Sequence, residues 1–170
     1  MKKELENLSE ILRGGTIKRY HTLEIIGEQS VASHSWGVAI IVEYLDPEIN
    51  KNTVLKALTH DVAELSTGDI PAPVKWEEFE LVQALKQIEQ KYEQKLGVAK
   101  YSRHMSQKEK SLFKQADMFE LLFFCVRQRR LGNANMNIVF SNGIEFLANQ
   151  DLNERGSKLL GKLMKEYGGI

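Results

Sequence analysis

The sequence is poor in cysteine, the residue that builds disulfides and thiolate metal sites. Cys125 is the only cysteine in a chain of 170 residues, so no internal disulfide can form. A zinc site built from cysteine ligands is excluded for the same reason. Cys125 lies in the apolar run 121–126, which predicts a buried thiol rather than a reactive one.

Long apolar runs are also absent. No segment approaches the roughly 20 apolar residues that a helix needs to cross a bilayer. Residues 1–6 lack the apolar stretch of a secretory signal. We therefore expect a soluble, intracellular protein that has no membrane partner.

An excess of either charge is the third absence. Lys and Arg total 23, Asp and Glu also total 23, and the formal net charge is zero. Without a global basic field, we expect no nucleic-acid partner held through its phosphates. The basic cluster 127–130 is better explained as the last turn of a helix, where cations complement the helix dipole.

What is present is helical periodicity with short polar breaks. Hydrophobic residues make up 42% of the chain and charged residues 27%, the balance of a globular protein. Apolar residues recur at helical spacings, and glycine, proline or a capping residue bounds most segments. These patterns predict helices at 5–12, from Ser30 or Ser33 to Leu45, and at 54–65, 77–96, 106–126, 137–149 and 152–166.

The segments between those helices are predicted to be irregular. Residues 16–29 have a mixed pattern that is extended or irregular, residues 98–105 are predicted to form a loop, and Pro71 and Pro73 are expected to hold their neighbours extended. Strand patterns are absent apart from short apolar runs. The fold prediction is therefore all-α, with residues 1–170 forming a single compact helical bundle.

The predicted helix 54–65 carries three titratable residues on one side. At about 100° per residue, Asp61 lies about 100° and Glu64 about 40° from His60 around the helix axis. The opposite side holds the apolar residues Leu55, Leu58, Val62 and Leu65. Such a segment can be an ordinary amphipathic helix with a polar outer face, or it can present acid–base groups to a site.

Asp117 is the least expected residue of the predicted helix 106–126. Its neighbours on the same face are Phe113, Leu121 and Phe124, so its carboxylate should lose contact with water. An unpaired buried charge is costly. Asp117 therefore needs a lysine or arginine partner, a hydrogen-bond network or a metal ion.

His34 lies between two serines at the start of an apolar helix. Alone, a histidine in this place is more often a capping or hydrogen-bonded core residue than a metal ligand. Together with His60, Asp61 and Asp117, it gives two imidazoles and two carboxylates from three helices. Such a set suits a divalent Mn, Co, Fe, Mg or Zn ion and leaves coordination positions for water and a substrate oxygen.

The order of these residues resembles that of one enzyme superfamily. A histidine, a later His-Asp pair and a final lone Asp, here in the segments 33–35, 60–64 and 115–117, resemble the motifs of HD-domain phosphohydrolases. The block HDVAELSTGDIPAPVK at 60–75 is more specific and resembles bacterial 5′-deoxynucleotidases and phage dATP triphosphohydrolases. The resemblance extends from Arg19 to about Asp117, well over half of the chain.

This resemblance implies a role for each residue of the metal site and its surroundings. The implied metal ligands are His34, His60, Asp61 and Asp117. Glu64 would be the acid–base residue that orients the attacking water, and Asp69 would lie near the scissile phosphate. The alternative for Asp69 is an Asx turn in the segment 67–71.

The resemblance also implies residues that bind the substrate. Arg19, Lys75 and Lys114 would contact the phosphates, and the planar fork of an arginine can hold two oxygens at once. Tyr20 would pack on the base or sugar, and Thr22 would reach the base region. The alternatives are plain surface charge for the two lysines and a partly buried tyrosine for Tyr20.

The short chain and the segment 18–22 resemble the phage dATP triphosphohydrolases most. We therefore expect a dATP or other dNTP triphosphohydrolase that releases a deoxynucleoside and tripolyphosphate. A 5′-deoxynucleotidase that acts on deoxynucleoside monophosphates is one alternative, and a non-catalytic nucleotide sensor is another. The expected partner is a small deoxyribonucleotide, in the cytoplasm of a bacterium or a phage-infected host cell. Relatives form homo-oligomers, so a homo-oligomer is also expected, with the helices after Gly132 as a candidate interface.

Overall fold

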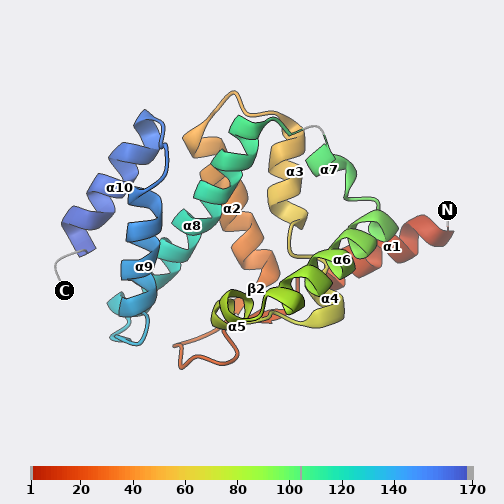
Figure 1. Cartoon of the computed structure of the whole chain (residues 1–170), viewed down its shortest axis with the longest axis horizontal. Coiled ribbons are helices and arrows are strands. Elements are labelled where there is room, and N and C mark those ends of the chain that lie inside the picture. Colours follow the sequence, from red (N-terminus) through yellow and green to blue (C-terminus); the bar gives the residue numbers. More distant parts are fainter. Residues whose placement is uncertain (1, 104, 168–170) are drawn as a thin grey trace.

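The computed structural model describes residues 2–103 and 105–167, and helices form most of this part of the chain (Figure 1). The helices are α1 Lys2–Gly14, α2 Val31–Leu45, α3 Lys51–Thr59, α4 Glu64–Thr67, α5 Ala72–Glu77, α6 Phe79–Leu96, α7 Lys100–Arg103, α8 Gln107–Arg130, α9 Asn137–Ala148 and α10 Glu154–Tyr167. The prediction of an all-α fold is confirmed, whereas a single domain over residues 1–170 stays a prediction. None of the described helices combines the length and the apolar character that crossing a membrane requires.

The core lies where α2, α3, α8 and α9 meet. The long helix α8 packs against both α2 and α9, while α3 lies against α2 (Figure 1). Fully buried side chains in this core include Leu45 of α2, Phe119 and Leu122 of α8, and Leu147 of α9. Cys125 is buried among them, as its apolar neighbours predict, and burial raises the pKa of its thiol to about 12.

Capping residues begin α2 and α8 where the sequence predicts. The Ser30 hydroxyl accepts a hydrogen bond from the backbone N–H of Ser33, and the Ser33 hydroxyl accepts one from the backbone N–H of Ser30. Ser106 and Glu109 form the same reciprocal capping box at the start of α8. Each box satisfies two backbone N–H groups and fixes the register in which its helix begins.

A small sheet occupies part of the segment 16–29, which was predicted to be extended or irregular. β1 (Lys18–Arg19) pairs antiparallel with β2 (Gln29–Ser30), and Arg19 lies opposite Gln29. Strands of two residues are too short to show the alternation by which a strand is recognised in a sequence. The pairing holds Arg19 beside the start of α2.

The prediction of one continuous helix over 54–65 is wrong, because the helix is interrupted between α3 and α4. α3 ends at Thr59, His60 follows as its C-cap residue, and α4 begins only at Glu64. In the segment 62–66, four backbone N–H groups bond to the carbonyl three positions earlier, so the chain winds more tightly than an α-helix. Angles of 100° per residue do not apply across this break, and Leu58, expected on the core side, is 41% exposed.

Two short helices occupy stretches that were predicted to be extended or irregular. α5 begins directly after Pro71, and Pro73 occupies its first turn. Proline is tolerated there because the N–H groups of a first turn have no partner within the helix. α7 lies inside the segment 98–105. The two prolines therefore start a helix rather than prevent one.

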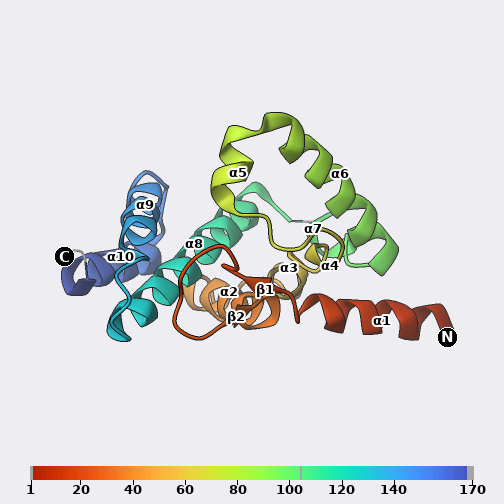
Figure 2. The same cartoon turned by 90° about the horizontal axis from the view of Figure 1, so that it is seen from below.

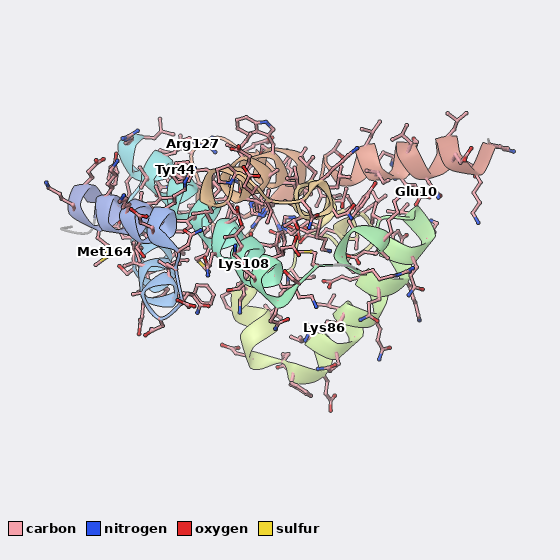
Figure 3. All side chains as sticks on the ribbon, turned by 90° about the horizontal axis from the view of Figure 1, so that it is seen from above. Glu10, Tyr44, Lys86, Lys108, Arg127 and Met164 are labelled. Carbon is pink, nitrogen blue, oxygen red and sulfur yellow. The ribbon has the colours of Figure 1, made fainter. Side chains whose placement is uncertain are left out.

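Helices α5 and α6 form an arm that stands away from the layer of α2, α3 and α8 (Figure 2). The C-terminal end of α6 is anchored by a small apolar cluster that contains Val62, Leu96 and Val98. Lys95 of α6 also forms an ion pair with Glu10 of α1, which Figure 3 labels near the end of α6. This anchoring ties the arm to the break between α3 and α4.

Candidate metal centre

Three helical segments bring His34, His60 and Asp117 together. His34 comes from the beginning of α2, His60 from the end of α3 and Asp117 from the middle of α8. Nε2 of His34 lies 3.1 Å from Oδ1 of Asp117 and 3.2 Å from Nε2 of His60. One donor atom from each residue lies within 4.8 Å of the other two, so a single ion can contact all three.

Both imidazoles are oriented by hydrogen bonds at their Nδ1 atoms. Nδ1–H of His60 donates to the carbonyl of Ala57 at 2.8 Å, because a carbonyl can only accept. Nδ1 of His34 lies 2.5 Å from Oε2 of Glu120, whose other carboxylate oxygen accepts from Gln29. Each ring therefore turns its Nε2 atom toward the other candidate ligands.

Asp61 lies at the edge of this group. Its Oδ2 atom is 3.2 Å from Nε2 of His60 and 3.7 Å from Nε2 of His34, and it accepts from Arg19 at 3.4 Å. Burial disfavours the charged form, but His60 and Arg19 outweigh it and hold the pKa of Asp61 well below its usual range. Asp61 is thus an ionised carboxylate beside two imidazoles, while its role as a ligand stays a prediction.

The donor set suits a divalent cation. When the proton of a neutral His34 sits on Nδ1, the lone pair on Nε2 faces the carboxylate oxygen of Asp117 at 3.1 Å. Two acceptors in contact need a cation between them, either a second proton or a metal ion. Imidazoles combined with carboxylates bind Zn, Mn, Fe and Co well, and the carboxylates also suit Mg. The predicted divalent metal cofactor therefore has a group of residues able to hold it.

In the metal-free protein, the carboxylates of this group favour a proton on His60. Burial opposes protonation of His60, but the charges of Asp61 and Asp117 outweigh it and raise the pKa of His60 to about 9. A metal ligand must be deprotonated, so an incoming metal ion would displace this proton. The carboxylates thus favour a cation at this place whichever form it takes.

Asp117 is less enclosed than its apolar neighbours in the sequence predict. Its side chain is 44% exposed, and its partner is His34 rather than a lysine or arginine. Burial would raise its pKa, but the hydrogen bond with His34 and the charge of His60 lower the pKa of Asp117. The exposed side of this carboxylate leaves the centre open to water and to a substrate.

Glu64 and Asp69 lie near this group without forming hydrogen bonds to it in the described chain. Oε2 of Glu64 is buried and has no hydrogen-bond partner among the described residues. Burial, together with the charges of Asp61 and Asp69, raises the pKa of Glu64 to about 8. Asp69 accepts a hydrogen bond from the backbone N–H of Tyr20 at 3.1 Å. A carboxyl group with a pKa near neutrality is suited to proton transfer.

Arg19 and Tyr20 reach the centre from the end of β1. Arg19 pairs with Asp61, and its Nε atom is buried without a partner in the described chain. Tyr20 has a positive φ of 56°, and its ring stacks on that of Phe124 at a centroid distance of 4.6 Å. A left-handed backbone at a bulky residue is an outlier, and such outliers gather at functional sites. The structure therefore places an aromatic pair beside the predicted phosphate-binding arginine.

The other predicted substrate-binding residues lie further out. Lys75 of α5 is half-buried, and its positive charge lowers the pKa of Glu64 against the larger effects that raise it. Lys114 is exposed, with its Nζ atom 5.1 Å from the centroid of the Phe146 ring. Thr22 is exposed in the loop between β1 and β2. In the part of the chain that is described, no hydrogen bond or ion pair joins these three residues to the metal-ligand candidates, and their roles stay predictions.

Glu120 and Gln29 belong to the site, and the interpretation of the sequence missed both. Glu120 is only 8% exposed, although it is charged, and it follows Asp117 by three residues within the apolar run 118–124. A charge among apolar neighbours is the signal that singled out Asp117, and it applies equally to Glu120. Gln29 carries no comparable signal, because its contact with Glu120 spans 91 residues of sequence.

Similarity to known proteins identifies the family. The family described as 5′-deoxynucleotidase YfbR-like matches residues 8–156 of this chain. A 5′-deoxynucleotidase of Klebsiella pneumoniae is 30% identical over 138 residues, which cover 69% of each protein. The 5′-deoxynucleotidase YfbR of Escherichia coli is 29% identical over 152 residues, which cover 77% of this chain and 76% of that protein.

A solved structure supports the same fold. The HD phosphohydrolase DatZ of cyanophage S-2L, solved with dA and one catalytic Zn²⁺ ion, superposes with a TM-score of 0.68. The two proteins are 24% identical, and the match covers 93% of this chain and 94% of that one. At this identity the likeness shows only that the helices are arranged in the same way. The family assignment comes from the sequence match over residues 8–156. This chain therefore belongs to the 5′-deoxynucleotidase YfbR-like family and is an HD-domain phosphohydrolase.

Proposed function

We propose that this protein is a 5′-deoxynucleotidase, which hydrolyses deoxynucleoside monophosphates to a deoxynucleoside and inorganic phosphate. The family match over residues 8–156 carries this proposal, and relatives named 5′-deoxynucleotidases support it. A non-catalytic sensor is disfavoured, because Glu64 retains the properties of an acid–base group beside the candidate metal centre.

Of the three cations predicted to bind phosphate, Arg19 is the one that contacts a candidate metal ligand in the described chain. Arg19 forms an ion pair with Asp61, one of the candidate ligands. Lys114 lies against Phe146, and Lys75 acts on Glu64. A triphosphate chain needs several cations within reach of its oxygens. The dNTP triphosphohydrolase expected from the short chain is therefore the weaker candidate, and the alternative of a monophosphatase takes its place.

In the proposed reaction, water attacks phosphorus and the bond from phosphorus to O5′ breaks. Glu64 takes the proton of the water, because its buried Oε2 atom has no other partner in the described chain and its pKa lies close to neutrality. The departing O5′ atom takes up this proton from Glu64, directly or through water, and leaves as the hydroxyl of the deoxynucleoside. A divalent ion held by His34, His60 and Asp117 would polarise the phosphoryl group as a Lewis acid and lower the pKa of water. Arg19 would hold two phosphate oxygens with its planar fork.

The deoxynucleoside would lie against Tyr20. The Tyr20 hydroxyl is buried and has no partner among the described residues, which is costly unless a ligand supplies one. A sugar hydroxyl or a base nitrogen would satisfy it. The hydrogen bond from the Tyr20 backbone to Asp69 fixes this residue relative to the block 60–75. Thr22, two residues after Tyr20 in the same loop, would face the base region.

Product analysis separates the two hydrolase reactions. We expect purified protein with Mn²⁺ or Co²⁺ to convert deoxynucleoside monophosphates to deoxynucleoside and phosphate, with kcat/KM at least about tenfold higher than for deoxynucleoside triphosphates. Ion-exchange chromatography resolves the products of each incubation. Release of tripolyphosphate from a dNTP, with no turnover of any dNMP, would overturn the monophosphatase and restore the triphosphohydrolase. Ribonucleoside monophosphates serve as the matched control for the sugar.

We also propose that the protein forms a homo-oligomer through one face of α1 and α2. The helices after Gly132, the interface predicted from the sequence, place Phe140, Leu147, Leu160 and Leu163 in the core. Among their described residues, the exposed large apolar side chains are Ile138 and Met164. Exposed apolar side chains, each 43% to 68% accessible, gather instead on α1 and α2 as Leu5, Leu8, Leu12, Trp36, Ile40 and Tyr44. A second copy is the occupant we propose for this apolar face.

The two helices present this face together. Trp36, Ile40 and Tyr44 repeat every four residues and therefore share one side of α2. A Cβ atom added to Gly15, just after α1, would lie 3.0 Å from the Cβ of Ala32, so the end of α1 abuts the start of α2. Figure 2 shows α1 extending from that end of α2 toward the N-terminus.

Light scattering of size-exclusion fractions tests the interface. We expect wild-type protein to be oligomeric at micromolar concentrations and Trp36→Glu to be monomeric, because a charge in an apolar interface is costly to bury. Phe79→Glu is the matched control, since Phe79 is an apolar residue of α6 that is 74% exposed away from this face. A monomeric wild-type protein, or an oligomer that survives Trp36→Glu, would contradict the proposed interface.

A further inference from the structure

We infer that Glu120 is a positioning residue that holds His34 in the orientation and tautomer of a metal ligand. This role of Glu120 rests on the metal-dependent function proposed above and adds a residue that does not itself contact the substrate. The carboxylate acts through Nδ1 of His34 and leaves Nε2 directed at Asp117 and His60.

The contact between Glu120 and His34 is short and enclosed. Oε2 of Glu120 lies 2.5 Å from Nδ1 of His34, and the two side chains are 11% and 1% exposed. An ionised carboxylate can only accept, so the proton of the imidazole must sit on Nδ1. The lone pair of the neutral ring is then on Nε2, the atom that faces Asp117.

Glu120 is itself held at its second oxygen. Nε2 of Gln29 donates to Oε1 of Glu120 at 2.8 Å, and the Gln29 residue is 2% exposed. Gln29 lies in β2, directly before the capping residue Ser30 of α2. Because both oxygens of Glu120 have protein partners, this carboxylate is not available as a proton acceptor for water. A positioning role is the one that its contacts allow.

A glycine leaves room for this carboxylate. Gly37 lies on α2 three residues after His34, and a Cβ atom there would lie 2.7 Å from Cγ of Glu120 and 3.4 Å from its Oε1. Glycine inside a helix is less favourable than alanine, so a helical glycine calls for a compensating close approach. The close approach at Gly37 is the side chain of Glu120.

The two histidines of the centre are held by different partners. Nδ1 of His60 donates to the neutral carbonyl of Ala57, whereas Nδ1 of His34 donates to a carboxylate. A carboxylate partner makes the opposite ring nitrogen more basic and therefore a better donor to a metal ion. His34 also lies closest to Asp117, so an error in its orientation would affect the contacts of the whole group.

Glu120→Gln removes the charge while keeping the shape of the side chain. We expect the metal-free variant to bind Co²⁺ about 10- to 100-fold more weakly than wild type in a calorimetric titration, with an altered visible spectrum of the bound Co²⁺. Its thermal unfolding without metal should stay close to that of wild type. A merely structural role would do the opposite, lowering the unfolding temperature and leaving Co²⁺ affinity unchanged.

Gly37→Ala approaches the same contact from the other helix. Its added methyl group would displace Glu120 without changing any candidate ligand, so Co²⁺ affinity should fall in the same direction. Gln115→Ala is the matched control, since Gln115 is buried on α8 but bonds to Ser111 and to the backbone of Asp151. This control should keep the Co²⁺ affinity of wild type.

Wild-type Co²⁺ affinity and spectrum in Glu120→Gln would overturn the role of Glu120. If Glu120→Gln does not fold, wild-type Co²⁺ affinity and spectrum in Gly37→Ala would overturn the role of Glu120. The proposed monophosphatase can fail separately, because release of tripolyphosphate from a dNTP would overturn it while Co²⁺ binding and its dependence on Glu120 persist. Wild-type protein that binds no Co²⁺ would overturn the metal-dependent function and the role of Glu120 together. Normal Co²⁺ binding by wild type with weakened binding in Glu120→Gln supports the role of Glu120.

Discussion

Asp117→Ala should give a folded protein that binds Co²⁺ at least about a hundredfold more weakly than wild type and turns over nucleotide about a thousandfold more slowly. Asp117 supplies the carboxylate that faces Nε2 of His34 at 3.1 Å, and without it the group loses one of its three candidate ligands and one of the negative charges beside the two imidazoles. The side chain is 44% exposed, so its removal leaves no closed cavity and the helix α8 should persist. Calorimetry and metal analysis measure the loss of Co²⁺ binding, and phosphate release measures the loss of turnover.

Lys114→Ala is the matched control on the same helix. Lys114 precedes Asp117 by three residues and is exposed, and its charge contacts the ring of Phe146. We expect this variant to keep the metal content of wild type and to raise KM for the nucleotide, because only the phosphate contact implied for Lys114 by the resemblance would be lost. Wild-type metal content in Asp117→Ala would contradict the assignment of Asp117 as a ligand.

Glu64→Gln should give a folded protein with wild-type Co²⁺ affinity whose kcat is lower by about 10²- to 10⁴-fold. The amide keeps the size of the side chain but cannot take a proton from water. Glu64 is suited to this task because its Oε2 atom is buried without a partner in the described chain. Near-normal turnover of deoxynucleoside monophosphates by this variant would count against Glu64 as the acid–base residue.

The pH dependence of stability gives an independent readout of Glu64. Its pKa in the folded, metal-free protein is about 8, well above the ordinary value of 4.5. The folded state therefore binds more protons than the unfolded state between these values, and the free energy of unfolding falls as pH rises through them. Glu64→Gln lacks this loss, so above pH 8 it should melt roughly 3 °C or more above wild type, while near pH 4.5 the two should agree. If the difference in melting temperature between the two proteins did not change with pH, a group other than Glu64 would be responsible for the pH dependence of stability.

The residue types of the metal centre could be recognised in the sequence because they interrupt apolar patterns. Asp117 lies within an apolar stripe of α8, and His34 lies in the first turn of an apolar helix. The block 60–75 then identified the superfamily, which the family match confirms. The order of residues along the chain was enough for this step, and no geometry was needed.

The exact shape of the centre could not be predicted, because it depends on contacts between distant segments. Residues 62–66 look like part of one amphipathic helix, yet the turn that carries them is tighter and ends α3 at Thr59. Glu120 meets His34 across 86 residues of sequence, and only packing of α8 on α2 brings them together. Helical spacing predicted α1, but it could not tell whether its leucines meet the same chain or another one.

The convergence of α2, α3 and α8 also has a thermodynamic consequence. An ion shared by His34 and His60 would close a loop of 26 residues, and Asp117 would close a longer one. Ligands so far apart meet only in the folded chain, because the unfolded chain would lose entropy in gathering them. Binding would therefore stabilise the folded state in proportion to the logarithm of free metal concentration. By chelation, a chain with one cysteine would thus gain the reversible cross-link that it cannot make from sulfur.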